Sequence, residues 1–69
     1  MKLFAVMYLK GQLAAAMFIG PGATMHDCEK TNALYASALP MSAGIQSGEV
    51  KLEDVRLDCE WHAENPLRK

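Results

Sequence analysis

Two cysteine–histidine pairs are the residues of this sequence whose types could do chemistry. His26 and Cys28 lie two positions apart, and Cys59 and His62 lie three apart. Thiolate and imidazole groups bind Zn²⁺, and a cysteine beside a histidine can act as a nucleophile. Residues two apart on a helix diverge by about 200°, and residues three apart on a strand point to opposite faces. The spacing therefore predicts no metal site, no catalytic residues and no cofactor.

A bond between the two cysteines is the simpler use of these sulfurs. A Cys28–Cys59 disulfide would stabilise the fold by about 3–4 kcal/mol through loop entropy. In a chain of 69 residues, that is comparable with the whole net stability that a small core supplies. Such a bond forms only in an oxidising compartment. In a reducing cytosol the same pair would be two small buried apolar groups.

Length and composition set the class of protein. The chain has 69 residues, of which 51% are hydrophobic and 22% charged, with a net charge of −1. These values fit one small globular domain, residues 1–69, and exclude a disordered tail or a coiled coil. Nucleic-acid binders usually carry a basic excess. We therefore expect no direct contact with nucleic acid.

The apolar segment at the start of the chain predicts a β-hairpin over residues 2–19, turning at Lys10-Gly11. Lys10 lies in the middle of the apolar stretch and argues against a membrane span. A signal peptide over residues 1–16 is the alternative, because a basic start precedes an apolar run and three alanines. The hairpin favours a cytoplasmic protein, and the signal peptide a periplasmic or secreted one.

The next segments predict one helix and one further strand. Thr24 offers an N-cap oxygen with Asp27 at the capping-box position, so a helix is expected over 25–39 and ends before Pro40. Its apolar stripe comprises Cys28, Thr31, Leu34, Tyr35, Ala38 and Leu39. Residues 40–48 are expected to form a flexible connection. In the strand region 50–62, residues 55–62 alternate between apolar and polar side chains.

These elements predict an α+β fold of the type ββαβ. The helix connects the second strand to the third, so those two strands should run parallel through a right-handed crossover. The simplest three-stranded sheet then has the order 2-1-3, with the helix on one face. In this arrangement Cys28 lies on the helix above Cys59 on the sheet.

Both faces of the predicted hairpin are apolar, which one helix cannot cover. With a two-residue turn, Phe4 faces Met17 on one side and Leu3 faces Phe18 on the other. An uncovered apolar face usually marks an interface. We expect either a partner, or self-association as a homodimer, or a cover formed by residues 41–48 or the C-terminal tail. The candidate residues for this apolar face are Leu3, Met7, Leu9 and Phe18.

An acidic region offers a second candidate surface. Between residues 49 and 64 there are six acidic and two basic residues, a net charge of −4. Acidic side chains beside an apolar patch suit docking on a basic protein surface, although they also fit a simple solvated face. The candidate residues of the acidic strand face are Glu53, Asp54, Asp58 and Glu60.

Several short motifs carry a resemblance. Gly20-Pro21, Thr24, Cys28-Glu29 and Cys59-Glu60-Trp61, in a chain of this size, resemble short orphan proteins of bacteria and phages, of the anti-CRISPR inhibitor kind. The resemblance covers size and architecture and transfers no functional residue. It implies a non-enzymatic protein that binds and blocks a defence effector complex, which is itself basic and binds nucleic acid.

Two functions are therefore expected, neither involving an enzyme or a membrane. The first is a protein–protein interaction module, most specifically an inhibitor of a bacterial defence complex. The alternative is a small secreted or periplasmic structural domain held by a Cys28–Cys59 bond.

Overall fold

The computed structural model describes residues 1–67. Three strands and one long helix form most of the chain, in the order β1 Lys2–Leu9, β2 Gln12–Phe18, α1 Met25–Ala38 and β3 Val55–His62. The connection from α1 to β3 contains a 3₁₀ turn at Leu39–Met41, the short helix α2 at Ala43–Gln46 and a second 3₁₀ turn at Leu52–Asp54. The expected α+β fold with the order ββαβ is confirmed. The connection predicted to be flexible is partly helical.

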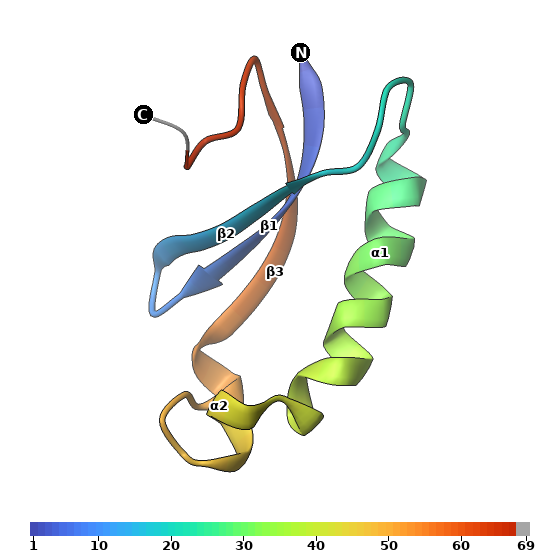
Figure 1. The fold of residues 1–69 in the computed structure, drawn as a ribbon. Coiled ribbons are helices and arrows are strands. Elements are labelled where there is room, and N and C mark those ends of the chain that lie inside the picture. Colours follow the sequence, from blue (N-terminus) through green and yellow to red (C-terminus); the bar gives the residue numbers. More distant parts are fainter. Residues whose placement is uncertain (68–69) are drawn as a thin grey trace.

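The strand order of the sheet is β2-β1-β3, as predicted. The central strand β1 is antiparallel to both neighbours, so β2 and β3 run in the same direction. This direction is the one that a helical crossover between β2 and β3 requires. Figure 1 shows α1 packed along one side of the sheet.

The hairpin turn lies where the sequence predicts it. Lys10 and Gly11 both have positive φ, 52° and 81°, as a type I′ turn requires. Leu9 pairs with Gln12 on either side of this turn. The backbone N–H of Lys10 also donates to the carbonyl of Asp54 at 3.0 Å, which attaches the turn to the segment before β3.

The predicted hairpin register is correct next to the turn, at Tyr8 and Leu9, and wrong for the residues of β1 before Tyr8. A β-bulge between Met7 and Tyr8 shifts the pairing by one residue, so Phe4 pairs with Phe18 rather than with Met17. Register is specified by differences between side chains on the two faces. Residues 14–16 are all alanine and offer no such difference, so the extra residue is not visible in the sequence pattern.

The start of α1 is a capping box, as predicted. The Asp27 N–H donates to Thr24 Oγ1 at 3.3 Å, and the Thr24 N–H donates to Asp27 Oδ2 at 2.9 Å. The hydrogen bond from the Thr24 backbone lowers the pKa of Asp27. The helix ends at Ala38, one residue earlier than expected, and Pro40 lies in the 3₁₀ turn that follows. The predicted apolar stripe is wrong at Leu34, which is 73% exposed, and at Ala38, which is also exposed.

The buried core depends on β1. Leu3, Ala5 and Cys28 form a buried cluster between β1 and α1, with Cys59 packed against it. Four of the five buried hydrophobic residues among the described ones lie in β1; they are Leu3, Phe4, Ala5 and Val6. Removal of residues 1–16 as a signal peptide would take this central strand out of the sheet.

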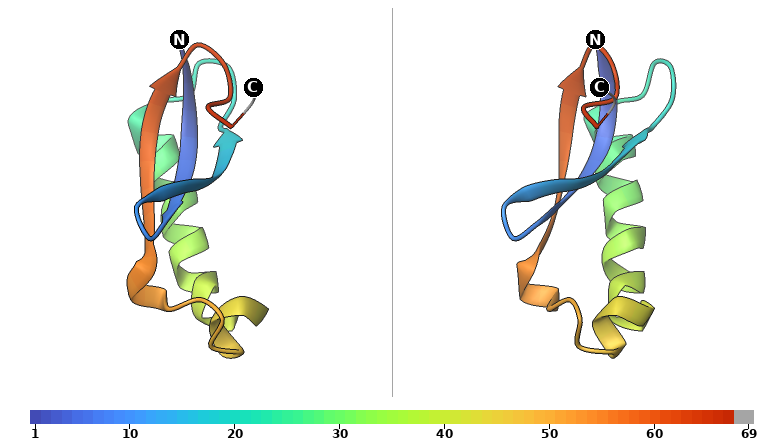
Figure 2. Two further views of the ribbon diagram at one scale, coloured as in Figure 1. Left: turned by 90° about the vertical axis from the view of Figure 1, so that its left-hand side faces the viewer. Right: turned by 60° about the vertical axis from the view of Figure 1, so that its left-hand side comes forward.

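The side of the sheet away from α1 is covered in part by the C-terminal segment. Phe4, only 2% exposed, packs between the rings of Phe18 and His62, with centroids 5.8 Å and 6.0 Å away. The Asn65 amide donates to the carbonyl of Ala16 at 3.3 Å. In both views of Figure 2 the segment after β3 folds back beside the sheet, and Figure 1 places it opposite α1. The C-terminal segment, one of the expected covers, therefore shelters this face around Phe4 and Ala16.

Candidate functional site

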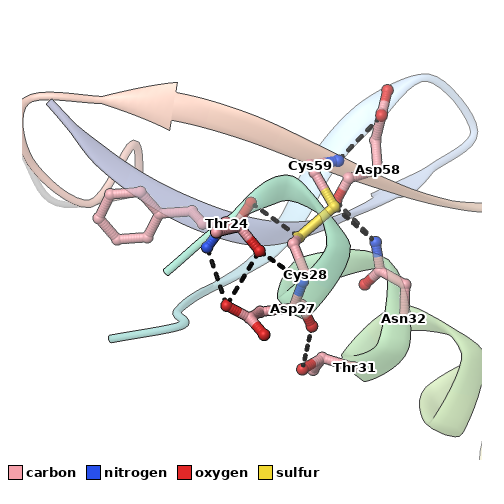
Figure 3. Close-up of a disulfide and its surroundings, with 8 residues drawn as sticks. Thr24, Asp27, Cys28, Thr31, Asn32, Asp58 and Cys59 are labelled. Atoms are coloured by element: carbon pink, nitrogen blue, oxygen red, sulfur yellow. Dashed lines mark hydrogen bonds between the residues drawn. A yellow bond between two sulfur atoms is a disulfide. The ribbon is translucent and has the colours of Figure 1, made fainter. Parts of the chain in front are cut away.

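The position of α1 is fixed by the Cys28–Cys59 disulfide, which links the first turn of the helix to β3. The two Cα atoms are 6.2 Å apart. One helical turn further on, the Asn32 amide donates to the carbonyl of Asp58 at 3.0 Å and lies 3.3 Å from Cys59 Sγ. Figure 3 shows these links between α1 and β3. The helix is therefore held against β1 and β3, and β2 receives little cover from it.

An apolar groove of about 290 Å³ lies where α1 leaves the sheet uncovered. None of its lining residues is charged. Ala15 and Met17 of β2 form one wall, and Tyr35 of α1 forms the other. Met17 and Tyr35 are 39% and 47% exposed, and the Tyr35 hydroxyl lies 3.3 Å from Met17 Sδ. The groove is thus open to solvent and flanked by large side chains.

Small residues explain why the groove exists. The Ala15 side chain, which lies on the α1 side of β2, is a methyl group, so β2 does not fill the space beside α1. The helix residues on this side are Asn32, Tyr35 and Leu39, which recur at helical spacing. The disulfide and the Asn32 bond hold α1 toward β3 and so away from β2. The groove has the volume of a small ligand pocket or of a few apolar side chains.

A polar cluster occupies the other side of the sheet. The Tyr8 hydroxyl donates to Glu60 Oε2 at 2.6 Å, and His62 Nε2 lies 2.8 Å from Glu60 Oε1. The hydrogen bond to Glu60 raises the pKa of Tyr8. The hydrogen bonds from Tyr8 and then from His62 lower the pKa of Glu60. The Arg56 guanidinium lies 4.5 Å from the centre of the Tyr8 ring.

The four predicted acidic residues do not form one acidic face. Glu53 and Asp54 lie in the 3₁₀ turn before β3, whereas Asp58 and Glu60 lie on β3. Alternation along β3 places Arg56 and His62 on the same face as Asp58 and Glu60, so that face carries both signs of charge. Glu60 is bonded within the cluster, and Asp58 Oδ1 accepts from the Cys59 N–H at 2.9 Å.

The four residues predicted to share an apolar face are divided between the two faces. Leu3 is 1% exposed and lies in the core. Met7 and Leu9 follow it on the α1 side of β1, where both are half-buried. Phe18 pairs with Phe4 and therefore lies on the opposite side, where it is 43% exposed. The exposed large apolar side chains that line the groove are Met17 and Tyr35. Others, such as Met41 and Trp61, are exposed elsewhere on the molecule.

The groove is the functional candidate that sequence reasoning missed. Its only signal in the sequence is the run of alanines at 14–16 beside larger apolar residues. The predicted disulfide, by contrast, is present, and the candidate chemistry of the cysteines is used in it. Within residues 1–67, no three His, Cys, Asp or Glu side chains are grouped so that they could hold a metal ion.

Comparison with protein families, with curated proteins and with solved structures finds no match for this chain. Across the part of the chain that the structure describes, every helix is too short or too polar to cross a bilayer. The groove, the disulfide and the sheet edges are therefore the features that bear on function.

Proposed function

We propose that this protein is a non-enzymatic protein-binding module that acts in an oxidising compartment and binds its partner through the apolar groove between α1 and the sheet. The groove itself carries the proposal. It is open, lined without charge and flanked by the exposed side chains of Met17 and Tyr35. Exposed apolar surface of this kind typically becomes buried against a partner.

The disulfide supports the choice of compartment. Structural disulfides persist in the periplasm and outside the cell, and are rare in the reducing cytosol. Cys28 is fully buried, which is typical of a structural bond rather than an exchanging one. This favours an oxidising compartment over the cytosol. It does not depend on residues 1–16 being removed as a signal peptide, because they contain the central strand β1.

The inhibitor of a bacterial defence complex remains a prediction from the resemblance. Such a protein would act in the cytosol, and the geometry gives it less support. Its acidic docking surface would include Asp58 and Glu60, but Arg56 and His62 lie on the same strand face. The proposed binding surface is therefore the groove rather than the acidic strand face.

Photo-crosslinking from two neighbouring helix positions tests the proposal. A photoreactive phenylalanine analogue at Tyr35 lies on the groove wall, and the same analogue at Leu34 is exposed elsewhere on α1. We expect a defined crosslinked species from position 35 in the producing cells and none from position 34. Ala15→Glu places a charge in the groove and should abolish the crosslink.

The fold of each variant is checked by the presence of the disulfide and by circular dichroism. Equal crosslinking from positions 34 and 35, or crosslinking that survives Ala15→Glu in a folded protein, would show that the groove is not the binding surface.

A further inference from the structure

The outer edge of β2 exposes backbone hydrogen-bonding groups at a defined position. The Ile19 N–H donates to the Leu3 carbonyl at 3.2 Å, so these two residues form a hydrogen-bonded pair of the antiparallel ladder. Hydrogen-bonded and non-hydrogen-bonded pairs alternate along such a ladder. Ala16, which pairs with Val6 three steps further, therefore directs its N–H and C=O away from β1. The bond from Asn65 to the Ala16 carbonyl agrees with this orientation.

The two edges of the sheet differ in how they are protected. Edge strands are usually blocked by charged side chains, proline or bulges. On β3, Arg56, Asp58 and Glu60 are charged, and Asp58 accepts the Cys59 N–H. Strand β2 has no charged residue from Gln12 to Phe18. Its protection consists of the bulge near the turn and the single bond from Asn65.

We propose that two copies of this chain associate by pairing β2 with β2 in antiparallel orientation, centred on Ala16. This inference rests on the proposed function and names the partner that fills the groove. The pairing is isologous, so each contact occurs twice. It extends the sheet to six strands and places both copies of α1 on the same face.

Side-chain sizes favour this pairing. With Ala16 opposite its own copy, Met17 of one chain lies opposite Ala15 of the other. Both residues line the groove. The long Met17 side chain of each copy therefore lies over Ala15 of the other copy, beside that copy's groove. No charge is present on either strand to repel the other. The chain itself therefore supplies the uncharged, extended segment that the edge and the groove require.

Asn65 acts as a competitor for the edge. Its amide occupies the Ala16 carbonyl at 3.3 Å, and this carbonyl would accept from the second copy in the proposed dimer. One neutral hydrogen bond contributes modestly to stability. Each dimer displaces two such bonds, one from each copy, so we expect Asn65→Ala to lower the dimer dissociation constant by about tenfold to a hundredfold.

Sedimentation of the full oxidised chain over a range of concentrations tests the dimer. We expect a monomer–dimer equilibrium that Asn65→Ala shifts toward dimer. Ala16→Pro should abolish the dimer and keep the hairpin, because proline is tolerated where the N–H faces outward at a sheet edge. Backbone hydrogen exchange of the unmodified chain gives a second measurement. The Ala16 N–H should gain protection as concentration rises, while the Met17 N–H, directed toward β1, should not.

The outcomes separate the two proposals. A monomer at every concentration in both the unmodified chain and Asn65→Ala would overturn the dimer, and so would a dimer with unchanged exchange at Ala16. If no dimer forms but position 35 still gives a crosslink that Ala15→Glu abolishes, the groove binds a different partner and the proposed function is supported without the dimer. If the groove crosslinks are also absent, both proposals fail.

Discussion

Reduction of the Cys28–Cys59 disulfide is expected to destabilise the protein mainly through its unfolded state. The bond joins residues separated by 31 positions. The loop-entropy relation for a loop of this length gives about 3.7 kcal/mol at 25 °C. A domain of 69 residues has a net stability of about 3.5–10 kcal/mol. The disulfide therefore supplies a large share of the total.

The expected size of the effect can be measured as a melting shift. For domains of this size, 1 kcal/mol changes the unfolding midpoint by about 4–8 °C. Reduction should therefore lower the midpoint by roughly 15–30 °C. The reduced unfolded chain is also less constrained and exposes more surface, so its urea m-value should be larger than that of the oxidised protein.

The assay compares thermal and urea unfolding of the oxidised protein with that of the protein held reduced by a phosphine. The double variant Cys28→Ala/Cys59→Ala provides the matched control, because it lacks the bond without any reductant. A midpoint shift below about 5 °C in the reduced protein would refute the loop-entropy argument for this bond. An unchanged m-value beside a large midpoint shift would place the effect in the folded state instead.

Two further predictions concern the turn and the polar cluster. Lys10, at φ 52°, occupies a conformation that asparagine tolerates better than lysine. Lys10→Asn should therefore raise the free energy of unfolding by about 0.5–1 kcal/mol. Equal unfolding midpoints for this variant and for the strand control Gln12→Asn would contradict this. The pKa of Glu60 is lowered in the folded state by its hydrogen bonds from Tyr8 and His62. Its ionised form therefore stabilises the fold at pH values above its ordinary pKa of 4.5, and this stabilisation is lost as the pH falls through the lowered pKa. Glu60→Gln should reduce the midpoint at pH 7 and flatten its decline in acid, and parallel melting curves from pH 7 to acid would argue against this.

Local signals account for the parts of the fold that the sequence predicts. Gly11, Thr24 and Pro40 each restrict the backbone in a distinct way, so the turn and the helix ends are predicted to within one residue. The alternation over 55–62 predicts both the extent of β3 and the face that carries Cys59. The strand order follows from chain connectivity, because the helix makes β2 and β3 parallel and β1, antiparallel to both, fits between them.

Features that depend on tertiary packing were not predictable in this way. The bulge lies in an alanine run in which neighbouring registers look alike. The bond of Tyr8 to Glu60 requires the register between β1 and β3, which are far apart in sequence. The groove depends on how the disulfide and Asn32 hold α1 toward β3, and no local pattern specifies that displacement.

The central position of β1 has a consequence for synthesis of the chain. Ribosomes produce β1 first, whereas its neighbour β3 begins only at Val55. Until β3 has been made, the apolar residues at 3–6 have one neighbouring strand and no cysteine at position 59 to secure the helix. Newly made chains in this state are prone to aggregate, so cellular yield is expected to depend on how quickly the last third of the polypeptide is completed and docks.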